Sequence, residues 1–406
     1  MWNYRYKTHH DVEKVLSKLI KNHICSKHAF LEKLEKANAS GQLSLYVHTP
    51  YCDTICSFCN LNRRRGKKEI ESYSKKLCEE IRNYTKFPFC QSSEVDVIFF
   101  GGGTPTIYTE IQLENILKAI HSSFRLAPHC EFTFETTLHN LSQEKIALLE
   151  KYGVNRLSIG IQTFSTRGRK ILNRSFPKEI VLKRLHEIHH SFHGTLCIDI
   201  IYNYPQQTIE ELLEDVHCIS DCHIDSVSFY SLIVEEKSKL FCFFQKNPLF
   251  FEHHLEKDKE FHHIFCEQML QHGYHLLELT KFVKKDKYQY IQNNYQARNL
   301  LPIGSGSGGR IEEIACYHMN SNISFYLKYS SEYIQKYKLL GLFQFPSIPE
   351  ERLQSLSEES YERIRNKMED FVKQGYFSYQ NHQFIYTIAG IFWGNNIAAE
   401  ILKLCS

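Results

Sequence analysis

Six short apolar runs alternate with helical patterns between residues 43 and 232, and this alternation restricts the fold more than any other feature. The runs are rich in β-branched residues, which predicts strands at 43–49, 95–100, 131–136, 156–161, 196–202 and 226–232. Helical patterns lie between them at 69–84, 110–124, 142–152, 177–190 and 209–221. Strands that alternate with helices form a parallel sheet covered by helices. The sequence therefore predicts an α/β fold whose site lies at the carboxyl ends of the strands.

The segments around this alternation predict four units. Residues 1–40 have a charged helical pattern and form an N-terminal extension, and residues 41–235 form the core of six strand–helix pairs. Residues 236–320 complete the barrel and contribute to the substrate site. Residues 321–406 form a C-terminal accessory unit, helical or winged-helix-like, with two helices around a hairpin near 376–387. Hydrophobic residues make up 42% of the 406, which suits a folded chain with a large core.

The overall charge and the hydropathy pattern exclude several classes of protein. A formal net charge of +3 is too small to indicate a nucleic-acid partner. The chain has no run of 18 apolar residues and no cleavable signal, so we expect no membrane span. We expect a cytoplasmic protein, in which the 14 cysteines stay reduced.

Three cysteines follow the first predicted strand within one short loop: Cys52, Cys56 and Cys59. Three thiolates at this spacing can hold three irons of a [4Fe–4S] cluster and leave the fourth iron open to a substrate or cofactor. Zinc is an alternative, although its fourth ligand would have to be His48 or a distant residue. Unrelated cysteines are a further alternative, and a disulfide conflicts with a reducing compartment.

Further polar motifs follow the other predicted strands. Glycines in the run Gly101-Gly-Gly-Thr104 allow backbone to approach a ligand closely, although they also suit a tight turn. Glu135 ends the third strand, where it is either solvated or an acceptor for an ammonium group. Gln162 suits sugar hydroxyls, and Arg174 suits a carboxylate. Asp199 lies in an apolar strand, which is costly unless the carboxylate has a partner.

These motifs, in this order, resemble the radical S-adenosylmethionine (SAM) superfamily and, within it, the coproporphyrinogen-oxidase-like (HemN-like, class C) subfamily. The resemblance covers roughly 43–315 and 384–401. It implies a partial (β/α)6 TIM-like barrel that holds a [4Fe–4S] cluster on the three cysteines. It also implies that SAM chelates the open iron, and that an electron from the cluster cleaves SAM to a 5′-deoxyadenosyl radical.

The resemblance implies cofactor contacts along the whole row of motifs. Phe58 matches an aromatic residue that packs near the adenine, and Tyr46 and His48 match residues ahead of the first cysteine. The family usually has Gly-Leu-Pro where this chain has Asn203-Tyr-Pro205, which implies a differently shaped cavity near that turn. The implied SAM-contacting residues are Tyr46, Phe58, Gly101, Gly102, Gly103, Thr104, Glu135, Gln162, Arg174 and Asp199.

Motifs outside this row distinguish members of the subfamily. Oxygen-independent coproporphyrinogen oxidases have a further cysteine where this chain has Leu61, and haem chaperones have a late Gly-Pro-Gly-Ala-His-Ser-type turn. Here that turn is Gly304-Ser-Gly-Ser-Gly-Gly-Arg310, followed by Tyr317-His-Met-Asn320. This turn, and Ala389-Gly-Ile-Phe-Trp393 near the C-terminus, resemble the anaerobic haem-degrading radical SAM methyltransferases (the ChuW/HutW group).

The resemblance to that group implies a reaction. A SAM-derived methylene radical attacks a meso carbon of haem, the macrocycle opens to a linear tetrapyrrole, and iron is released. A haem chaperone, a methyltransferase for another tetrapyrrole or heteroaromatic, and a coproporphyrinogen oxidase remain alternatives.

The expected partners are haem or a related tetrapyrrole and a reductant of the flavodoxin or ferredoxin type. An aromatic content of 13% can line a flat apolar pocket. The basic run 63–68 is either a solvated face or a contact for haem propionates. His318 and Tyr317 are candidate proton donors.

Overall fold

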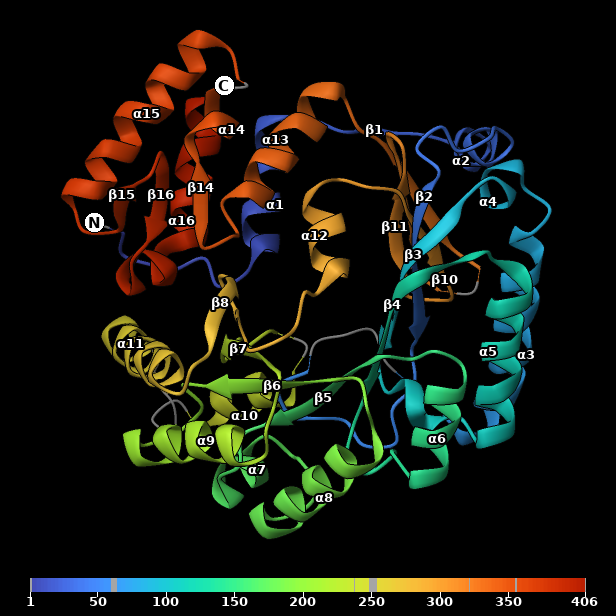
Figure 1. The fold of residues 1–406 in the computed structure, drawn as a ribbon. Helices are drawn as coiled ribbons and strands as arrows, with labels where there is room; N and C mark the ends of the chain where they lie inside the picture. The colour runs from blue at the N-terminus through green and yellow to red at the C-terminus, as the bar shows by residue number, and fades with distance from the viewer. Residues whose placement is uncertain are drawn as a thin grey trace.

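The computed structural model describes residues 2–59, 64–236, 238–247, 254–320, 322–354 and 356–405. Six parallel strands lie side by side in chain order at its centre (Figure 1). Their bounds lie within a few residues of the predicted runs. The strands are β2 (Gln42–Thr49), β3 (Glu94–Gly102), β4 (Leu126–Thr136), β5 (Arg156–Gln162), β6 (Thr195–Tyr202) and β7 (Ser226–Ser231). The prediction of an α/β fold built on a parallel sheet is confirmed.

Helices between these strands cover the outer face of the sheet (Figure 1). Several begin at side chains that cap their free N–H groups: Thr109 and Thr208 form capping boxes with Gln112 and Glu211, and Ser142 accepts from the backbone of Lys145. Short helices α4 (Pro88–Gln91), η1 (Pro105–Ile107) and α7 (Thr166–Ile171) occupy loops. The main helices are α3 (Lys67–Tyr84), α5 (Glu110–Ser123), α6 (Gln143–Lys151), α8 (Lys178–Ser191) and α9 (Ile209–Asp221).

Further strands extend the sheet at both edges. β10 (Leu300–Ile303) pairs in parallel with β2, and β9 (Lys281–Val283) pairs antiparallel with β7. The edge beyond β10 is antiparallel and ends with a strand from the N-terminal segment. The remaining strands are β11 (Gly308–Ile311), β12 (Ile314–His318), β13 (Ser324–Lys328), β1 (His23–Ile24) and, beyond β9, β8 (His275–Glu278).

The C-terminal residues build a second sheet and a second core. The sheet has the order β14–β16–β15, and its hairpin β15–β16 lies between two helices, as the sequence predicts. Phe371, Phe384 and Trp393 lie in the core between them. The elements are α13 (Ser331–Leu342), β14 (Ser347–Pro349), α14 (Glu350–Gln354), α15 (Glu358–Lys373), β15 (Phe377–Gln380), β16 (Gln383–Tyr386) and α16 (Ile388–Leu404).

The N-terminal segment packs between the barrel and this C-terminal unit (Figure 1). Trp2 stacks near Trp393, with 5.2 Å between ring centroids. The Arg5 guanidinium donates to the Phe392 carbonyl at 2.8 Å and to the Tyr202 hydroxyl at 2.6 Å. The remaining helices of the chain are α1 (His9–Leu19), α2 (Lys27–Leu34), α10 (Lys239–Lys246), α11 (Leu255–Gln271) and α12 (Gln289–Tyr295).

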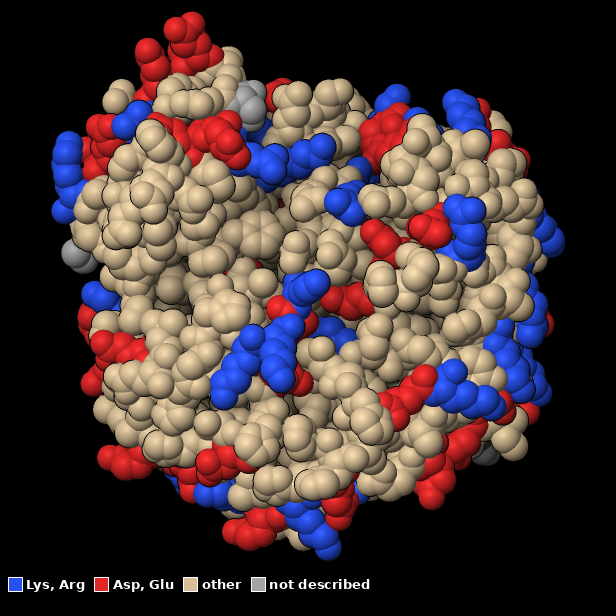
Figure 2. All heavy atoms as spheres, viewed as in Figure 1, with Lys and Arg blue, Asp and Glu red and all other residues tan. Residues whose placement is uncertain are grey.

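Within the described residues, no helix combines the length and the apolar character that crossing a membrane requires. Acidic and basic side chains are interspersed over the face in Figure 2, and several basic side chains gather near its middle.

A buried ion pair ties the first residue of β5 to the segment after β9. Arg156 donates three hydrogen bonds to Asp286, and the shortest N···O distance is 2.8 Å. The two side chains are only 3% and 2% exposed. A buried guanidinium that lost its carboxylate would carry an uncompensated charge.

We therefore expect Asp286→Ala to lower the free energy of unfolding by about 3–5 kcal/mol in urea denaturation. The exposed pair of Glu71 and Lys75 is the control, because Glu71→Ala should leave the urea midpoint nearly unchanged. Equal small losses for both variants would show that the Arg156–Asp286 pair does not anchor this segment.

Candidate active site

A pocket of about 200 Å³ opens where β2 to β6 end. All three cysteines of the loop line it, together with every predicted SAM-contacting residue except Tyr46 and Gly101. These residues come from separate loops, and the parallel sheet brings them together because its strands end at one edge. The residues are Cys52, Cys56, Phe58, Cys59, Gly102, Gly103, Thr104, Glu135, Gln162, Arg174 and Asp199.

Side chains from the opposite wall of the pocket contact two of the cysteines. Thr104 Oγ1 lies 3.7 Å from Cys52 Sγ, and Arg174 Nη1 lies 3.0 Å from Cys56 Sγ. Asn173 donates to the Ile55 carbonyl at 2.7 Å and so fixes the loop backbone. The arginine places positive charge beside a sulfur that would ligate iron.

The spacing of the three sulfurs argues against a single zinc ion. Four thiolates around zinc lie about 3.8 Å apart, as bonds of ~2.3 Å in a tetrahedron require. Among the described residues, the one group of three ligand-type side chains whose donor atoms lie within 4.8 Å of one another is elsewhere, on α1. The sulfurs of Cys52, Cys56 and Cys59 therefore do not all lie within 4.8 Å of one another, and a cluster does not require this, because its ligands bind separate iron atoms.

The glycine run packs against the cysteine loop itself. Gly102 has a φ of +111°, and a Cβ there would lie 2.6 Å from the Thr49 carbonyl oxygen. A Cβ at Gly103 would lie 2.4 Å from the Tyr51 carbonyl oxygen. The backbone of Thr104 donates to that same Tyr51 carbonyl at 2.8 Å. Only glycine fits these contacts, so the run positions the loop and leaves open backbone beside the pocket.

Two carboxylates, one on β4 and one on β6, face the pocket. Burial, and then the nearby charge of Asp199, raise the pKa of Glu135 to about 7, although the backbone N–H of Gly102 donates to Glu135 at 2.9 Å. Burial also raises the pKa of Asp199, against the opposing charge of Lys281. Two such carboxylates favour a cationic ligand, because a positive charge would relieve both the desolvation and the repulsion.

The amide of Gln162 and the guanidinium of Arg174 depend on a glycine that the sequence analysis did not predict. A Cβ at Gly160 would lie 2.9 Å from Gln162 Nε2 and 3.2 Å from Arg174 Nη2. Arg174 also donates to the carbonyl of Gly160. A glycine inside a strand often marks a close approach, and this signal could have been used.

His48 lies outside the pocket and joins β2 to the late glycine turn. Cβ atoms at Gly102 and Gly306 would lie 2.8 and 2.7 Å from its ring, so the imidazole lies between the two glycines. Burial lowers the pKa of His48 to about 4, so the ring is neutral at pH 7. Its Nδ1 lies 2.9 Å from the Tyr46 hydroxyl, and within the described residues Nε2 has no hydrogen-bond partner.

An aromatic layer lies beside a second, larger cavity. Tyr46 stacks on Phe99, and Phe99 stacks on Tyr290 with 4.4 Å between ring centroids. Tyr290 also lines the second cavity, of about 720 Å³, between α1, α12, α13 and strands β11 to β13. Six tyrosines line this tyrosine cavity: Tyr290, Tyr295, Tyr317, Tyr329, Tyr333 and Tyr337.

Comparison with known proteins places this geometry in a family. Residues 46–219 match the family model of the Radical SAM superfamily. A solved structure of coproporphyrinogen III oxidase (HemN) from Escherichia coli, described as a radical SAM enzyme, aligns with a TM-score of 0.77 at 18% identity. The alignment covers 94% of each chain. The chain contains a radical SAM domain, and its relatives are HemN-like and HemW-like proteins.

Curated relatives of this radical SAM protein have different names. The heme chaperone HemW of Lactococcus lactis is 26% identical over 379 residues, which cover 88% of this chain and 97% of that protein. The anaerobilin synthase of Escherichia coli O157:H7 is 26% identical over 283 residues, which cover 69% of this chain and 63% of that protein.

The radical SAM protein uses a [4Fe–4S] cluster and SAM, as its family does. The pocket fits both groups: its cysteines are spaced for a cluster, and its carboxylates and guanidinium complement the ammonium and carboxylate of SAM. The individual SAM contacts stay predictions.

Other predicted residues lie away from the pocket. His318 bonds Ser324 Oγ at 2.8 Å and lines a separate cavity beside α2 and α3. Tyr317 lines the tyrosine cavity. Of the basic run, Arg64 and Arg65 are exposed. Leu61 and Arg63 lie outside the described residues, as do the side chains of residues 67 and 68.

We expect Cys56→Ala to abolish cluster assembly, because two cysteines cannot hold three irons. Iron and sulfide analysis after anaerobic reconstitution would measure the loss. Cys242→Ala is the matched control, since Cys242 is an exposed cysteine on α10. A Cys56→Ala protein that still holds four irons per chain would refute the assignment of the triad.

We also expect SAM binding to weaken below pH 7, because Glu135 then gains a proton and its negative charge is lost. With a pKa near 7, the dissociation constant of SAM should rise about fivefold between pH 7 and pH 6. Equilibrium dialysis on cluster-loaded protein would measure it. The Glu135→Gln protein should bind SAM weakly, and its dissociation constant should change less between pH 7 and pH 6. An unchanged pH dependence in this variant would assign the effect to another group.

Proposed function

We propose that this protein methylates the haem macrocycle and opens it without oxygen, which gives a linear tetrapyrrole and releases iron. The contact between the late turn and the cluster strand carries the proposal. The turn resembles that of the haem-degrading methyltransferases, and its Gly306 packs on the ring of His48, four residues before Cys52. A Cβ at Gly304 would lie 2.7 Å from the His48 carbonyl oxygen. The turn that distinguishes subfamily members is thus part of the wall behind the pocket.

The chain's own residues bind and orient the cofactor. Bound at the triad, the cluster supplies the electron that cleaves SAM to a radical. Glu135 and Asp199 accept the ammonium of SAM, Arg174 pairs with its carboxylate, and Gln162 binds ribose hydroxyls. The loops that surround the pocket exclude water, so a reactive intermediate is protected from solvent.

The tyrosine cavity is the candidate binding site for the tetrapyrrole. Its volume of about 720 Å³ lies in the range of small-molecule pockets, and its lining is largely aromatic and aliphatic. Four basic side chains on the lining, Lys14, Lys18, Arg298 and Arg310, suit the propionates of haem. Tyr290 is shared between this cavity and the aromatic layer behind the SAM pocket. A flavodoxin or ferredoxin supplies the electrons.

A haem chaperone is the second candidate function. The heme chaperone HemW of Lactococcus lactis aligns over nearly its whole length, whereas the anaerobilin synthase aligns over 63% of its own. A chaperone would bind haem in the same cavity and leave the macrocycle intact.

One anaerobic experiment separates the two functions. Cluster-loaded protein is mixed with haem, SAM and a low-potential reductant, and the products are followed by absorption and mass spectrometry. We expect loss of the haem spectrum, a methylated linear tetrapyrrole and free iron. The Cys56→Ala protein should bind haem and leave it intact.

Unaltered haem with 5′-deoxyadenosine as the sole product would contradict the proposal and favour the chaperone. A methylated product with a closed ring would favour the methyltransferase alternative.

A further inference from the structure

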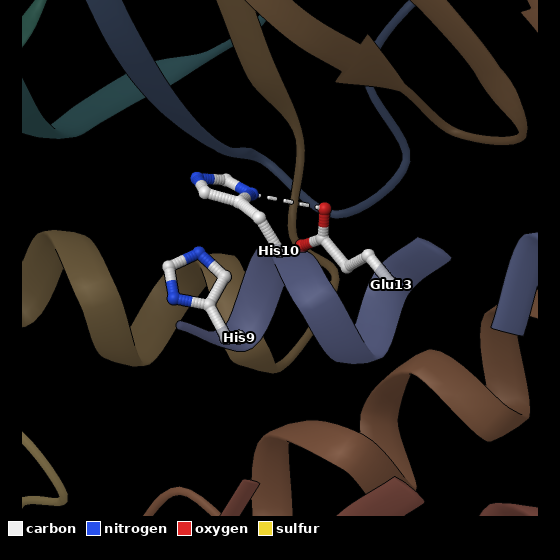
Figure 3. A group of neighbouring side chains, drawn as sticks. All are labelled: His9, His10 and Glu13. Atoms are coloured by element: carbon white, nitrogen blue, oxygen red, sulfur yellow. Dashed lines mark hydrogen bonds and ion pairs between the residues drawn. The ribbon is translucent and has the colours of Figure 1, made fainter. Parts of the chain in front are cut away.

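Three side chains near the start of α1 converge at the wall of the tyrosine cavity. His9, His10 and Glu13 each offer one donor atom, and these atoms lie within 4.8 Å of one another. Figure 3 shows one ring nitrogen of His9 directed toward the ring of His10, which is joined to Glu13. All three residues line the cavity, so an ion bound to them would face it.

The separation of two of the donors already matches a metal site. His10 Nδ1 lies 3.2 Å from Glu13 Oε2. Two ligands on one zinc ion with bonds of ~2.0–2.1 Å in a tetrahedron lie about 3.3 Å apart. The ring centroids of His9 and His10 are 4.1 Å apart, and the donor atom of His9 lies within 4.8 Å of those of His10 and Glu13.

Neighbouring side chains orient the ligands. The Tyr295 hydroxyl lies 3.4 Å from Glu278 Oε2, to which it donates, and 3.5 Å from His9 Nδ1. It therefore accepts from Nδ1–H of His9, which leaves Nε2 with its lone pair free. Tyr337 also lies beside Glu13 on the wall of the cavity. Partners of this kind fix the tautomer and orientation of metal ligands in proteins.

We propose that His9, His10 and Glu13 bind one divalent transition-metal ion, with an open coordination position directed into the tyrosine cavity. Two histidines and one carboxylate are the ligands of catalytic zinc sites and of non-haem ferrous sites. The site goes beyond the proposed function and needs neither SAM nor haem to form. Ferrous iron is also the ion that the proposed reaction would release beside it.

Zinc is the probe that tests the site, because it has no redox chemistry of its own. Cluster-loaded protein is dialysed against zinc, and zinc and iron are measured in the same sample. The iron content then shows whether the cysteine triad still holds its cluster, so that zinc bound there is not counted. We expect one tightly bound zinc per chain. His10→Ala should raise the dissociation constant at least about 100-fold, more than the roughly 10–100-fold that loss of a ligand's partner costs. Glu13→Gln should raise it at least about tenfold.

His263→Ala is the matched control. His263 and Glu267 form a similar exposed pair on α11, with 3.3 Å between Nε2 and Oε1, and no third ligand-type group joins them within the described residues. This variant should bind zinc as the parent does. The His10 side chain is 67% exposed, so His10→Ala should melt at the parent temperature.

Two results would overturn the proposal. One is tight zinc binding that survives in both His10→Ala and Glu13→Gln. The other is a protein that binds no zinc beyond the level of the His10→Ala variant. Neither result bears on haem turnover, so the metal site and the proposed function fail independently.

Discussion

The parallel ladder between β2 and β10 supports both halves of the active site. It pairs residues 300–303 with residues 44–47. Each strand ends at a motif: β2 leads into the cysteine loop, and β10 leads into the late glycine turn. A slip of one residue would turn every side chain of the strand to the other face of the sheet. His48 would then no longer lie between Gly102 and Gly306, and the turn would lose its contact with the strand that leads to the cluster.

The sequence predicts the central sheet well because its signal is local. Each of β2 to β7 is a buried, β-branched run, and helix caps such as Thr208 lie a few residues away. The row of motifs is also predictable, since residues at strand ends must meet at one edge. β1 and β10 to β13 were not predicted, because they are short and their pairing depends on partners far away in the chain.

The rest of the site depends on contacts that no local pattern contains. Gly160 makes room for Gln162 and Arg174, and His48 contacts a turn more than 250 residues later. The group on α1 was missed because Tyr295, which orients His9, lies 286 residues away. His318 was a candidate because of its neighbours in sequence, and the sheet places it on a different cavity.

The position of the first residues has a consequence for the order in which the protein can be built. Trp2, Arg5 and Tyr6 contact Trp393, Phe392 and Asn396 of α16. The ribosome makes these first residues long before the helix that receives them. During synthesis the barrel strands can pair, while α1 lacks the surface that holds it. The contacts between α1, which lines the tyrosine cavity, and α16 therefore form only after α16 has left the ribosome.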